Sequence, residues 1–267
     1  MIGGRSVIAI IFAGGVGKRL QESCADNFVQ TLPKQFLEVG GSPVLVHTLN
    51  IFQSNNKVDK IYIATYKDYV DYTKELVERY RITKIAGITT GADTAMGSQY
   101  NALKMAQQEN SGNSIVLIHD GVRPNVEQQT LENVINGTLE KGNAITCTSC
   151  FETALISADG KTVDNVPYRK NAFMAQAPQG FLLDELLQAH DTIRKTNPKY
   201  EDIVDCCTMY KTLGRPVFMA QGNRGNIKIT TIEDLYLLRG YIRYNEDKMI
   251  AEQSKMLVEK YENKGQK

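Results

Sequence analysis

The chain has 267 residues, 42% of them apolar, and carries 31 Lys and Arg against 30 Asp and Glu. This length suffices for one large α/β domain or two small ones, and either can bury a sizeable core. The formal net charge of +1 gives no global excess of charge that would favour nucleic acid or an anionic membrane surface as a partner. An anionic ligand must therefore be bound by a local cluster of cationic side chains.

The apolar runs and the cysteines indicate the compartment. The longest early apolar run, residues 7–13, is too short to span a membrane and poorly shaped for a signal peptide, so we expect a cytoplasmic protein. The cysteines are odd in number and scattered, which argues against a disulfide framework. Cys147 and Cys150 form a C-x-x-C pair, but no second Cys or His pair stands at metal-binding spacing, so we interpret the pair as structural.

The first half of the chain alternates between strand and helix patterns. Residues 6–13 form a continuous apolar run of strand length, which is typical of a strand buried on both faces. Residues 67–81 instead repeat apolar positions at helical spacing. We expect further strands at residues 60–66, 84–89, 114–119, 144–149 and 216–220, and further helices at 43–52, 97–108 and 127–141. This alternation predicts an α/β fold with a Rossmann-like, mostly parallel, doubly wound sheet, in which ligands bind at the carboxyl ends of the strands.

Two segments depart from this alternation. Residues 151–172 break into short polar pieces with turn residues at Asp159 and Asn165, which predicts a β-arm inserted into the sheet order. Such an arm commonly packs on a second subunit. Residues 231–263 are helix-like. We therefore expect one domain over residues 1–240, with the arm at about 150–173, and a C-terminal helical extension over 241–267.

The first candidate for a ligand site is Gly14-Gly15-Val16-Gly17-Lys18-Arg19, directly after the first predicted strand. Glycines at this place let backbone N–H groups surround phosphate oxygens, and the two cations bring further donors. The segment is not a Walker loop, because Lys18 is followed by Arg19 instead of Ser or Thr. It is also an incomplete dinucleotide fingerprint, since Leu20 stands where the third glycine belongs. We keep a Rossmann-type NAD-dependent oxidoreductase as the alternative from another class.

Three further segments place charged side chains near predicted strand ends. Lys34 follows a proline in a polar stretch downstream of the glycines, where a lysine is able to reach a phosphate as a point charge. Asp120 and Arg123 follow the strand at 114–119. The carboxylate is suited to a divalent cation that bridges phosphate oxygens, and the alternative is an ion pair that only ties the loop. Lys228 lies just before a predicted helix, so we expect it at the same edge of the sheet.

Together these segments resemble the 2-C-methyl-D-erythritol 4-phosphate cytidylyltransferase family, which includes the closely related ribitol-5-phosphate cytidylyltransferases. The resemblance covers residues 8–239, nearly the whole predicted core. It rests on Phe12-Ala-Gly-Gly-Val-Gly-Lys-Arg19, Pro33-Lys-Gln-Phe36, Gly91 with Ser98 and Asn101-Ala-Leu103, His119-Asp-Gly-Val-Arg-Pro124, Gln176-Ala-Pro-Gln-Gly-Phe181 and Asn226-Ile-Lys-Ile-Thr230. It implies a nucleotidyltransferase-type fold and a reaction in which a polyol phosphate attacks the α-phosphorus of CTP and releases pyrophosphate.

The resemblance also implies roles for individual residues. Arg19 and Lys34 match basic residues that contact the triphosphate and stabilise the transition state, and Lys228 matches a catalytic lysine that contacts the acceptor phosphate. Asp120 matches an aspartate that holds Mg²⁺ or another divalent cation. Arg169 lies in the arm and matches a residue that acts from the neighbouring subunit of a homodimer. The expected nucleotide contacts are Ala13, Gly14, Gly15, Gly17, Lys18, Gly91, Ser98 and Asp120, and the expected acceptor contacts are Thr153, Arg169, Lys228 and Asp205.

The chain departs from the usual residues of this family in the arm and in the pocket. Ala95 stands where the family customarily has Arg, and Leu155 stands where the arm usually carries Lys. Ala177 and Val204 each replace a threonine. These departures favour D-ribitol 5-phosphate as the acceptor, with 2-C-methyl-D-erythritol 4-phosphate, and hence isoprenoid precursor synthesis, as the alternative.

Two rivals within this fold class are disfavoured. A catalytically inactive relative would be expected to lose Lys34 or Lys228, and both are present. A nucleotidyltransferase for a sugar 1-phosphate would share the glycine loop without the motifs around Asp120 and Lys228. We therefore expect CTP and a polyol phosphate as ligands, no nucleic acid or membrane partner, and a homodimer formed through the arm.

Overall fold

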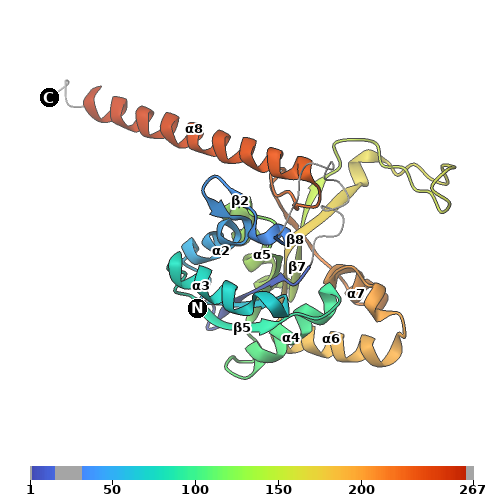
Figure 1. Ribbon diagram of the computed structural model, residues 1–267. Coiled ribbons are helices and arrows are strands. Elements are labelled where there is room, and N and C mark those ends of the chain that lie inside the picture. The colour runs from blue at the N-terminus through green and yellow to red at the C-terminus, as the bar shows by residue number, and fades with distance from the viewer. Residues whose placement is uncertain (1, 16–31, 263–267) are drawn as a thin grey trace.

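The computed structural model describes residues 2–15 and 32–262 and shows one central sheet with helices on both faces (Figure 1). The strands follow the order β5-β4-β1-β6-β8-β7-β9. Every neighbouring pair is parallel except those formed by β8, which runs against both β6 and β7. The strands are β1 (Val7–Ala13), β4 (Lys60–Thr65), β5 (Ile85–Thr90), β6 (Ile115–Asp120), β7 (Asn143–Ser149), β8 (Phe173–Leu182) and β9 (Met219–Gln221), and β2 (Glu38–Val39) pairs with β3 (Ser42–Pro43) outside this sheet.

The helices divide between the two faces of the sheet. One face packs against α2 (Val44–Ser54), α3 (Val70–Arg79) and α5 (Gln128–Lys141), and the other against α4 (Ala95–Gln107), α6 (Leu183–Thr196) and α7 (Cys206–Thr212). The long C-terminal helix is α8 (Ile232–Glu262), and short 3-10 turns are η1 (Lys34–Phe36), η2 (Lys67–Tyr69), η3 (Arg169–Asn171) and η4 (Tyr200–Asp202). The predicted doubly wound, mostly parallel α/β fold is confirmed.

Strand β1 shows why the sequence pattern predicts this fold. Val7, Ala9 and Ile11 pack into the core on one side of the sheet, and Ile8 and Ile10 pack into the core on the other side. Because successive side chains of a strand point to opposite faces, a strand covered on both faces needs apolar residues at every position. A continuous apolar run therefore marks the centre of the sheet.

Strand β8 was not expected from the sequence, because Pro178 and Gly180 interrupt its pattern. Proline has no N–H to donate to a sheet ladder. Pairing with β6 ends at Gln179, and the register with β7 shifts between Ile145 and Cys147, opposite the proline. The first half of β8 therefore leaves β6 and continues beside β7 alone, which opens space between β6 and β8.

The predicted arm projects from the body between β7 and β8 (Figure 1). Its backbone pairing is one isolated bridge between Ile156 and Asn165. At its tip, the carboxylate of Asp159 accepts hydrogen bonds from the backbone N–H groups of Lys161 and Thr162 at 2.7 and 2.8 Å. These bonds hold the pKa of Asp159 well below its ordinary range.

Helix α8 begins at a capped turn and runs without interruption past the predicted domain boundary at residue 240. The Oδ2 atom of Asp234 accepts the backbone N–H groups of Thr230 at 2.7 Å and Thr231 at 2.8 Å. Its first turns pack on the body through Leu235 and Leu238. The division of the chain at residue 240 stays a prediction.

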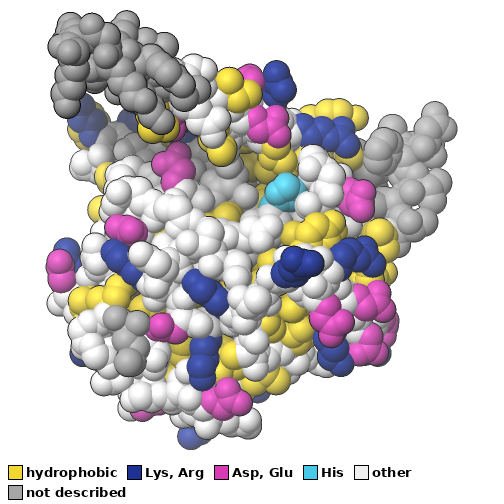
Figure 2. All heavy atoms as spheres, turned by 90° about the vertical axis from the view of Figure 1, so that its left-hand side faces the viewer, with side chains coloured by type: hydrophobic (Ala, Val, Ile, Leu, Met, Phe, Trp, Pro, Cys, Tyr) yellow, Lys and Arg dark blue, Asp and Glu magenta, His cyan; other side chains and the backbone are white. Residues whose placement is uncertain are grey.

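The surface carries no simple charge signature on the face turned to the viewer in Figure 2, where Lys and Arg alternate with Asp and Glu. None of the helices in the described part of the chain combines the length and the apolar character that crossing a membrane requires. Cys147, Cys150, Cys206 and Cys207 carry free thiols.

His190 in α6 makes folding sensitive to acid. The side chain is fully buried, and within residues 2–15 and 32–262 neither ring nitrogen has a hydrogen-bond partner. Burial lowers the pKa of His190 to about 4, below its ordinary value of 6.5. As the pH falls through this window the unfolded chain binds the proton first, so the folded state loses stability.

We expect His190→Leu to reduce this sensitivity at similar side-chain volume. When the pH falls from about 7 to 4.5, the unfolding free energy of both proteins should decrease. The decrease should be smaller in the variant than in the wild type by on the order of 2 kcal/mol. Urea unfolding followed by circular dichroism at both pH values measures the difference. If the unfolding free energies of the two proteins depended identically on pH, His190 would not be a source of the acid sensitivity.

Candidate active site

Two adjoining cavities lie at the carboxyl ends of β1 and β6. The first, of about 190 Å³, adjoins the glycines after β1 and is called the glycine lobe; the second, of about 200 Å³, contains two glutamines and is called the amide lobe. The glycine lobe is lined by Phe12, Ala13, Gly14, Gly15, Lys34, Gln35, Ala92, Asp93, Thr94, Ala95, Ser98, Asp120, Val122 and Lys228. The amide lobe is lined by Phe12, Gln99, Ile118, Asp120, Arg123, Ala177, Gln179, Val204, Asp205, Cys206 and Lys228.

The lobes share the wall formed by Phe12, Asp120 and Lys228. The sheet register explains this wall, because Phe12 at the end of β1 pairs with Asp120 at the end of β6. Each lobe alone is smaller than the ~300 Å³ of a typical small-molecule site. Together they form a site with two compartments that adjoin at the shared wall.

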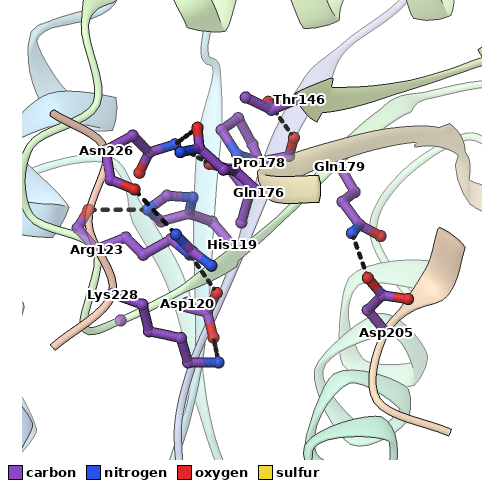
Figure 3. Close-up of polar contacts among 12 residues, drawn as sticks. His119, Asp120, Arg123, Thr146, Gln176, Pro178, Gln179, Asp205, Asn226 and Lys228 are labelled. Atoms are coloured by element: carbon purple, nitrogen blue, oxygen red, sulfur yellow. Dashed lines mark hydrogen bonds and ion pairs between the residues drawn. The ribbon is translucent and has the colours of Figure 1, made fainter. Parts of the chain in front are cut away.

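The buried carboxylate of Asp120 is the centre of this wall. Lys228 Nζ lies 2.5 Å from Oδ1, and Arg123 Nε lies 2.8 Å from Oδ2, so a separate cation holds each oxygen (Figure 3). Burial by itself would raise the pKa of Asp120, but the two cations outweigh burial and hold this pKa well below its ordinary range. The carboxylate is therefore ionised at neutral pH, and the group as a whole is cationic.

The backbone that carries Lys228 is fixed by Arg123 and Asn226. Arg123 Nη1 donates to the carbonyl oxygen of Asn226 at 3.0 Å. The Nδ2 group of Asn226 donates to the carbonyl oxygen of Ala177 at 2.6 Å and to Oε1 of Gln176 at 3.2 Å (Figure 3). The loop before α8 is thus attached both to the end of β6 and to β8.

His119 supports the same loop from the buried side. Burial lowers the pKa of His119 to about 4, so its ring is neutral at pH 7. Nε2 lies 3.1 Å from the carbonyl oxygen of Arg123, and because a carbonyl only accepts, Nε2 carries the proton. The ring also packs on Phe52, with 5.0 Å between the ring centroids. His119 therefore orients the loop.

The glycine lobe depends on the close approach of three segments. A Cβ atom at Gly91 would lie 3.0 Å from Ser98 Oγ, and one at Gly14 would lie 3.2 Å from the same atom. Ser98 Oγ accepts the backbone N–H of Ala92 at 2.9 Å and donates to the carbonyl oxygen of Thr94 at 2.9 Å. Gly14, Gly91 and Ser98, all expected to contact the nucleotide, thus lie together.

Lys34 and Gln35 reach the glycine lobe from η1. The buried side chain of Gln35 donates from Nε2 to the carbonyl oxygen of Ala13 at 2.7 Å, which fixes the end of β1. Lys34 Nζ donates to the carbonyl oxygen of Ile229 at 2.8 Å, one residue after Lys228. The structure thus brings together the two catalytic lysines expected from the sequence.

A hydrogen-bonded pair on one side of Figure 3 shapes the amide lobe. Gln179 Nε2 donates to Oδ2 of Asp205 at 3.0 Å, and Gln179 Oε1 accepts the backbone N–H of Cys207 at 3.0 Å. The other oxygen of Asp205 accepts the backbone N–H of Thr208 at 2.8 Å, which makes Asp205 the N-cap of α7. Helix α7 therefore begins directly after Asp205.

The structure places the expected site residues in three groups. Lining the lobes are Ala13, Gly14, Gly15, Lys34, Ser98, Asp120, Asp205 and Lys228, with Gly91 against Ser98. Thr153 and Arg169 are exposed in the arm and line neither lobe of their own chain. Gly17, Lys18 and Arg19 lie outside the described residues.

Sequence reasoning missed several residues that shape the site. Arg123 was weighed only as a partner that ties the loop, whereas it both pairs with Asp120 and lines the amide lobe. Gln99 and Gln179 carry no charge, and their positions in a helix and in an unexpected strand gave no signal. Gln179 does lie within the quoted motif Gln176-Ala-Pro-Gln-Gly-Phe181, so a search of the motifs for amide side chains would have found it.

The donor set fits a divalent cation that arrives with phosphate ligands. Within residues 2–15 and 32–262, no group of three or more His, Cys, Asp or Glu side chains is arranged to hold a metal ion. Asp93 and Asp120 contribute carboxylates to the glycine lobe. Mg²⁺ commonly takes one or two carboxylates and completes its shell with water and substrate phosphates, so Asp120 suits such a cation.

A doubly wound sheet that carries a glycine-bounded lobe and a second lobe across a cationic wall suits an enzyme that binds a nucleotide beside a second phosphate-bearing reactant, as nucleotidyltransferases do. Nothing in this arrangement requires a covalent nucleophile. The class is one in which two phosphate-bearing reactants are aligned and their charge is neutralised.

Comparisons with known proteins narrow this class. A family model described as 2-C-methyl-D-erythritol 4-phosphate cytidylyltransferase matches residues 7–244. The ribitol-5-phosphate cytidylyltransferase of Streptococcus agalactiae serotype III (strain NEM316) is 35% identical over 244 residues, covering 91% of this chain and 98% of the relative. The 2-C-methyl-D-erythritol 4-phosphate cytidylyltransferase of Clostridium botulinum (strain Okra / Type B1) is 32% identical over 228 residues, covering 85% and 93%.

A solved structure agrees with these sequence matches. The 4-diphosphocytidyl-2C-methyl-D-erythritol synthase from Anaerococcus prevotii DSM 20548 superposes with a TM-score of 0.75 at 29% identity, covering 91% of this chain and 98% of that chain. The chain belongs to the 2-C-methyl-D-erythritol 4-phosphate cytidylyltransferase family and is a nucleotidyltransferase enzyme. The resemblance inferred from the motifs is confirmed.

The tight packing at Gly91 predicts the effect of one added methyl group. In Gly91→Ala, the Cβ atom would lie 3.0 Å from Ser98 Oγ and 3.3 Å from the carbonyl oxygen of Thr65. To relieve these close contacts, the wall of the glycine lobe at Ser98 would have to shift. We therefore expect the KM for CTP to rise by about tenfold. Gly240→Ala is the control, because a Cβ atom there meets nothing within 4 Å. Equal KM values in the two variants would show that the wall tolerates the methyl group.

Proposed function

We propose that this enzyme transfers CMP from CTP to D-ribitol 5-phosphate and releases pyrophosphate. The observation that carries the proposal is the shared wall, where Asp120 and Lys228 stand between a glycine lobe suited to a triphosphate and an amide lobe suited to a polyol, with Arg123 paired to Asp120 on the amide-lobe side. The likeness to a ribitol-5-phosphate cytidylyltransferase across 91% of the chain supports this acceptor. So do the departures at Ala177 and Val204, which line the amide lobe and replace threonines that methylerythritol enzymes usually carry.

The geometry supports an in-line transfer. CTP in the glycine lobe would place its α-phosphorus near the wall, and a phosphate oxygen of the acceptor would attack it from the amide lobe as the bond to pyrophosphate breaks. Lys228 and Arg123, at the amide lobe, would hold the acceptor phosphate, and Lys34 would face the triphosphate. These cations offset the negative charge on the phosphoryl oxygens, which is the main requirement of this reaction.

A divalent cation, Mg²⁺ or a substitute, would be held by Asp120 together with the phosphates of CTP. When bound, such a cation neutralises phosphate charge and fixes the triphosphate conformation. In the structure both oxygens of Asp120 face cations, with Lys228 at 2.5 Å. We infer that Lys228 exchanges this carboxylate for the acceptor phosphate as the ligands assemble.

Pyrophosphate release tests the proposed acceptor directly. With CTP and Mg²⁺, we expect ribitol 5-phosphate to support the fastest release, above methylerythritol 4-phosphate and glycerol 3-phosphate. UTP and ATP are the controls for the base. A preference for methylerythritol 4-phosphate would instead assign the enzyme to isoprenoid precursor synthesis, and silence with all three acceptors would refute a polyol phosphate acceptor.

We further propose a homodimer formed through the arm, residues 150–172 with the start of β8. Apolar side chains are exposed all along this segment, which a partner would cover. They are Phe151, Leu155, Ile156, Val163, Val166, Tyr168, Phe173 and Met174. Arg169, exposed on the same segment and absent from both lobes of its own chain, would then reach the acceptor in the partner's amide lobe.

Mixing two inactive variants tests this arrangement. Lys34→Ala should lower kcat by about a hundredfold or more, because it removes a cation from the transition state. Arg169→Ala should lower kcat/KM for the acceptor. If Arg169 acts across the dimer, a mixed dimer keeps one intact site, and an equal mixture should regain about a quarter of wild-type activity.

The control mixes Lys34→Ala with a chain that carries both substitutions, and it should regain nothing. If the first mixture also stays inactive although an affinity tag on one variant co-purifies the other, which shows exchanged dimers, Arg169 serves its own chain and the arrangement is wrong. The cysteines of the described residues carry free thiols. Free thiols persist under reducing conditions, which supports a cytoplasmic location of the protein.

A further inference from the structure

The amide lobe contains a buried polar side chain that the proposed transfer does not use. Gln99 in α4 is 1% exposed, yet it lines this lobe. Its Oε1 atom lies 3.0 Å from the Sγ atom of Cys206, which is itself fully buried. Among the described residues, no group forms a hydrogen bond with Gln99 Nε2. This nitrogen is also not one of the fully buried polar atoms that lack a partner, so it is accessible from the lobe. The amide N–H₂ group therefore opens into the lobe.

The thiol of Cys206 sets the orientation of this amide. Burial raises the pKa of Cys206, so the thiol keeps its proton and acts as the donor in the contact. A thiol donor requires the oxygen of the amide to face it, which leaves the nitrogen for the lobe. Cys206 is in turn held at the first turn of α7, directly after the capping residue Asp205.

The other polar groups of the lobe are already assigned. Arg123 and Lys228 are cations suited to a phosphate. Gln179 and Asp205 are paired with each other and with backbone N–H groups at the start of α7. Gln99 therefore supplies a neutral donor in addition to these cations, and a neutral donor of this kind matches a hydroxyl group of a polyol chain.

We propose that Gln99 binds a hydroxyl group in the carbon chain of the acceptor and so determines which polyol phosphate is used, with Cys206 as its positioning residue. The inference rests on the proposed function, because it takes the amide lobe as the acceptor site. A site built to pair with a hydroxyl group discriminates against acceptors that lack one, because its own donor is then left unpaired.

Acceptor kinetics of Gln99→Met test the inference. This variant keeps the length of the side chain and removes both amide groups. We expect kcat/KM for ribitol 5-phosphate to fall by about tenfold to a hundredfold, mainly through KM, with the KM for CTP unchanged. Glycerol 3-phosphate is a shorter polyol phosphate and serves as a competitive inhibitor in the comparison. Its inhibition constant should differ by less than about threefold between Gln99→Met and the wild type.

Further variants separate recognition from folding. Gln99→Glu keeps an oxygen for Cys206 but removes the N–H₂ donor, and it should show the same rise in KM. Cys206→Ser retains a donor and should behave like the wild type, whereas Cys206→Ala should raise KM for ribitol 5-phosphate. Gln107→Met, on the exposed end of the same helix, is the matched control and should change nothing.

The outcomes distinguish the two proposals. Unchanged kinetics in Gln99→Met and Gln99→Glu, or equal losses for ribitol 5-phosphate and glycerol 3-phosphate, would overturn the role of Gln99 while the transfer reaction stands. If the wild type prefers methylerythritol 4-phosphate, that acceptor takes the place of ribitol 5-phosphate in the same comparison. A wild type that uses no polyol phosphate would overturn the proposed function, and this inference with it.

Discussion

The carboxylate of Asp120 remains ionised inside the protein because Arg123 and Lys228 each hold one of its oxygens. A buried charge without such partners would be neutralised or would destabilise the fold. In return, the carboxylate fixes two cations at the boundary between the two lobes. Arg123 extends this link to the backbone at Asn226, whose side chain bonds to β8. One ion cluster therefore connects β6, β8 and the loop before α8, and the site depends on all three.

The sheet provides the space that this cluster divides. Parallel pairing of β1 and β6 brings Phe12 opposite Asp120, so the glycine turn and the carboxylate meet at one edge. The antiparallel strand β8 pairs with β6 only as far as Gln179. Beyond that point β6 and β8 separate, and the amide lobe lies between them. A regular seven-stranded sheet would have closed this lobe.

Structure was predictable from the sequence where a single physical requirement restricts the residue type at each position. Strand β1 must be apolar at every position because both its faces are covered, so its pattern predicts its place. Lys34 and Lys228 are cations in motifs near strand ends, and charge is a readable signal. By contrast, β8 has proline and glycine in its interior, and Gln99 is a neutral residue on a helix, so neither the strand nor the amide has a distinctive pattern. Their roles depend on contacts with residues distant in sequence, such as Cys206.

The cationic wall also explains how a chain with a net charge of +1 is suited to polyanionic reactants. Lys34, Arg123 and Lys228 line the lobes around the buried carboxylate of Asp120, where charges are screened less than they are at the open surface. Surface charges of both signs, as in Figure 2, are screened over about one Debye length and largely cancel. Phosphate binding therefore depends on the few cations that the fold places at the wall, and not on the composition of the chain. A surface substitution that changes the net charge leaves this local excess intact, whereas the loss of Asp120 would remove the group that holds Arg123 and Lys228 in place.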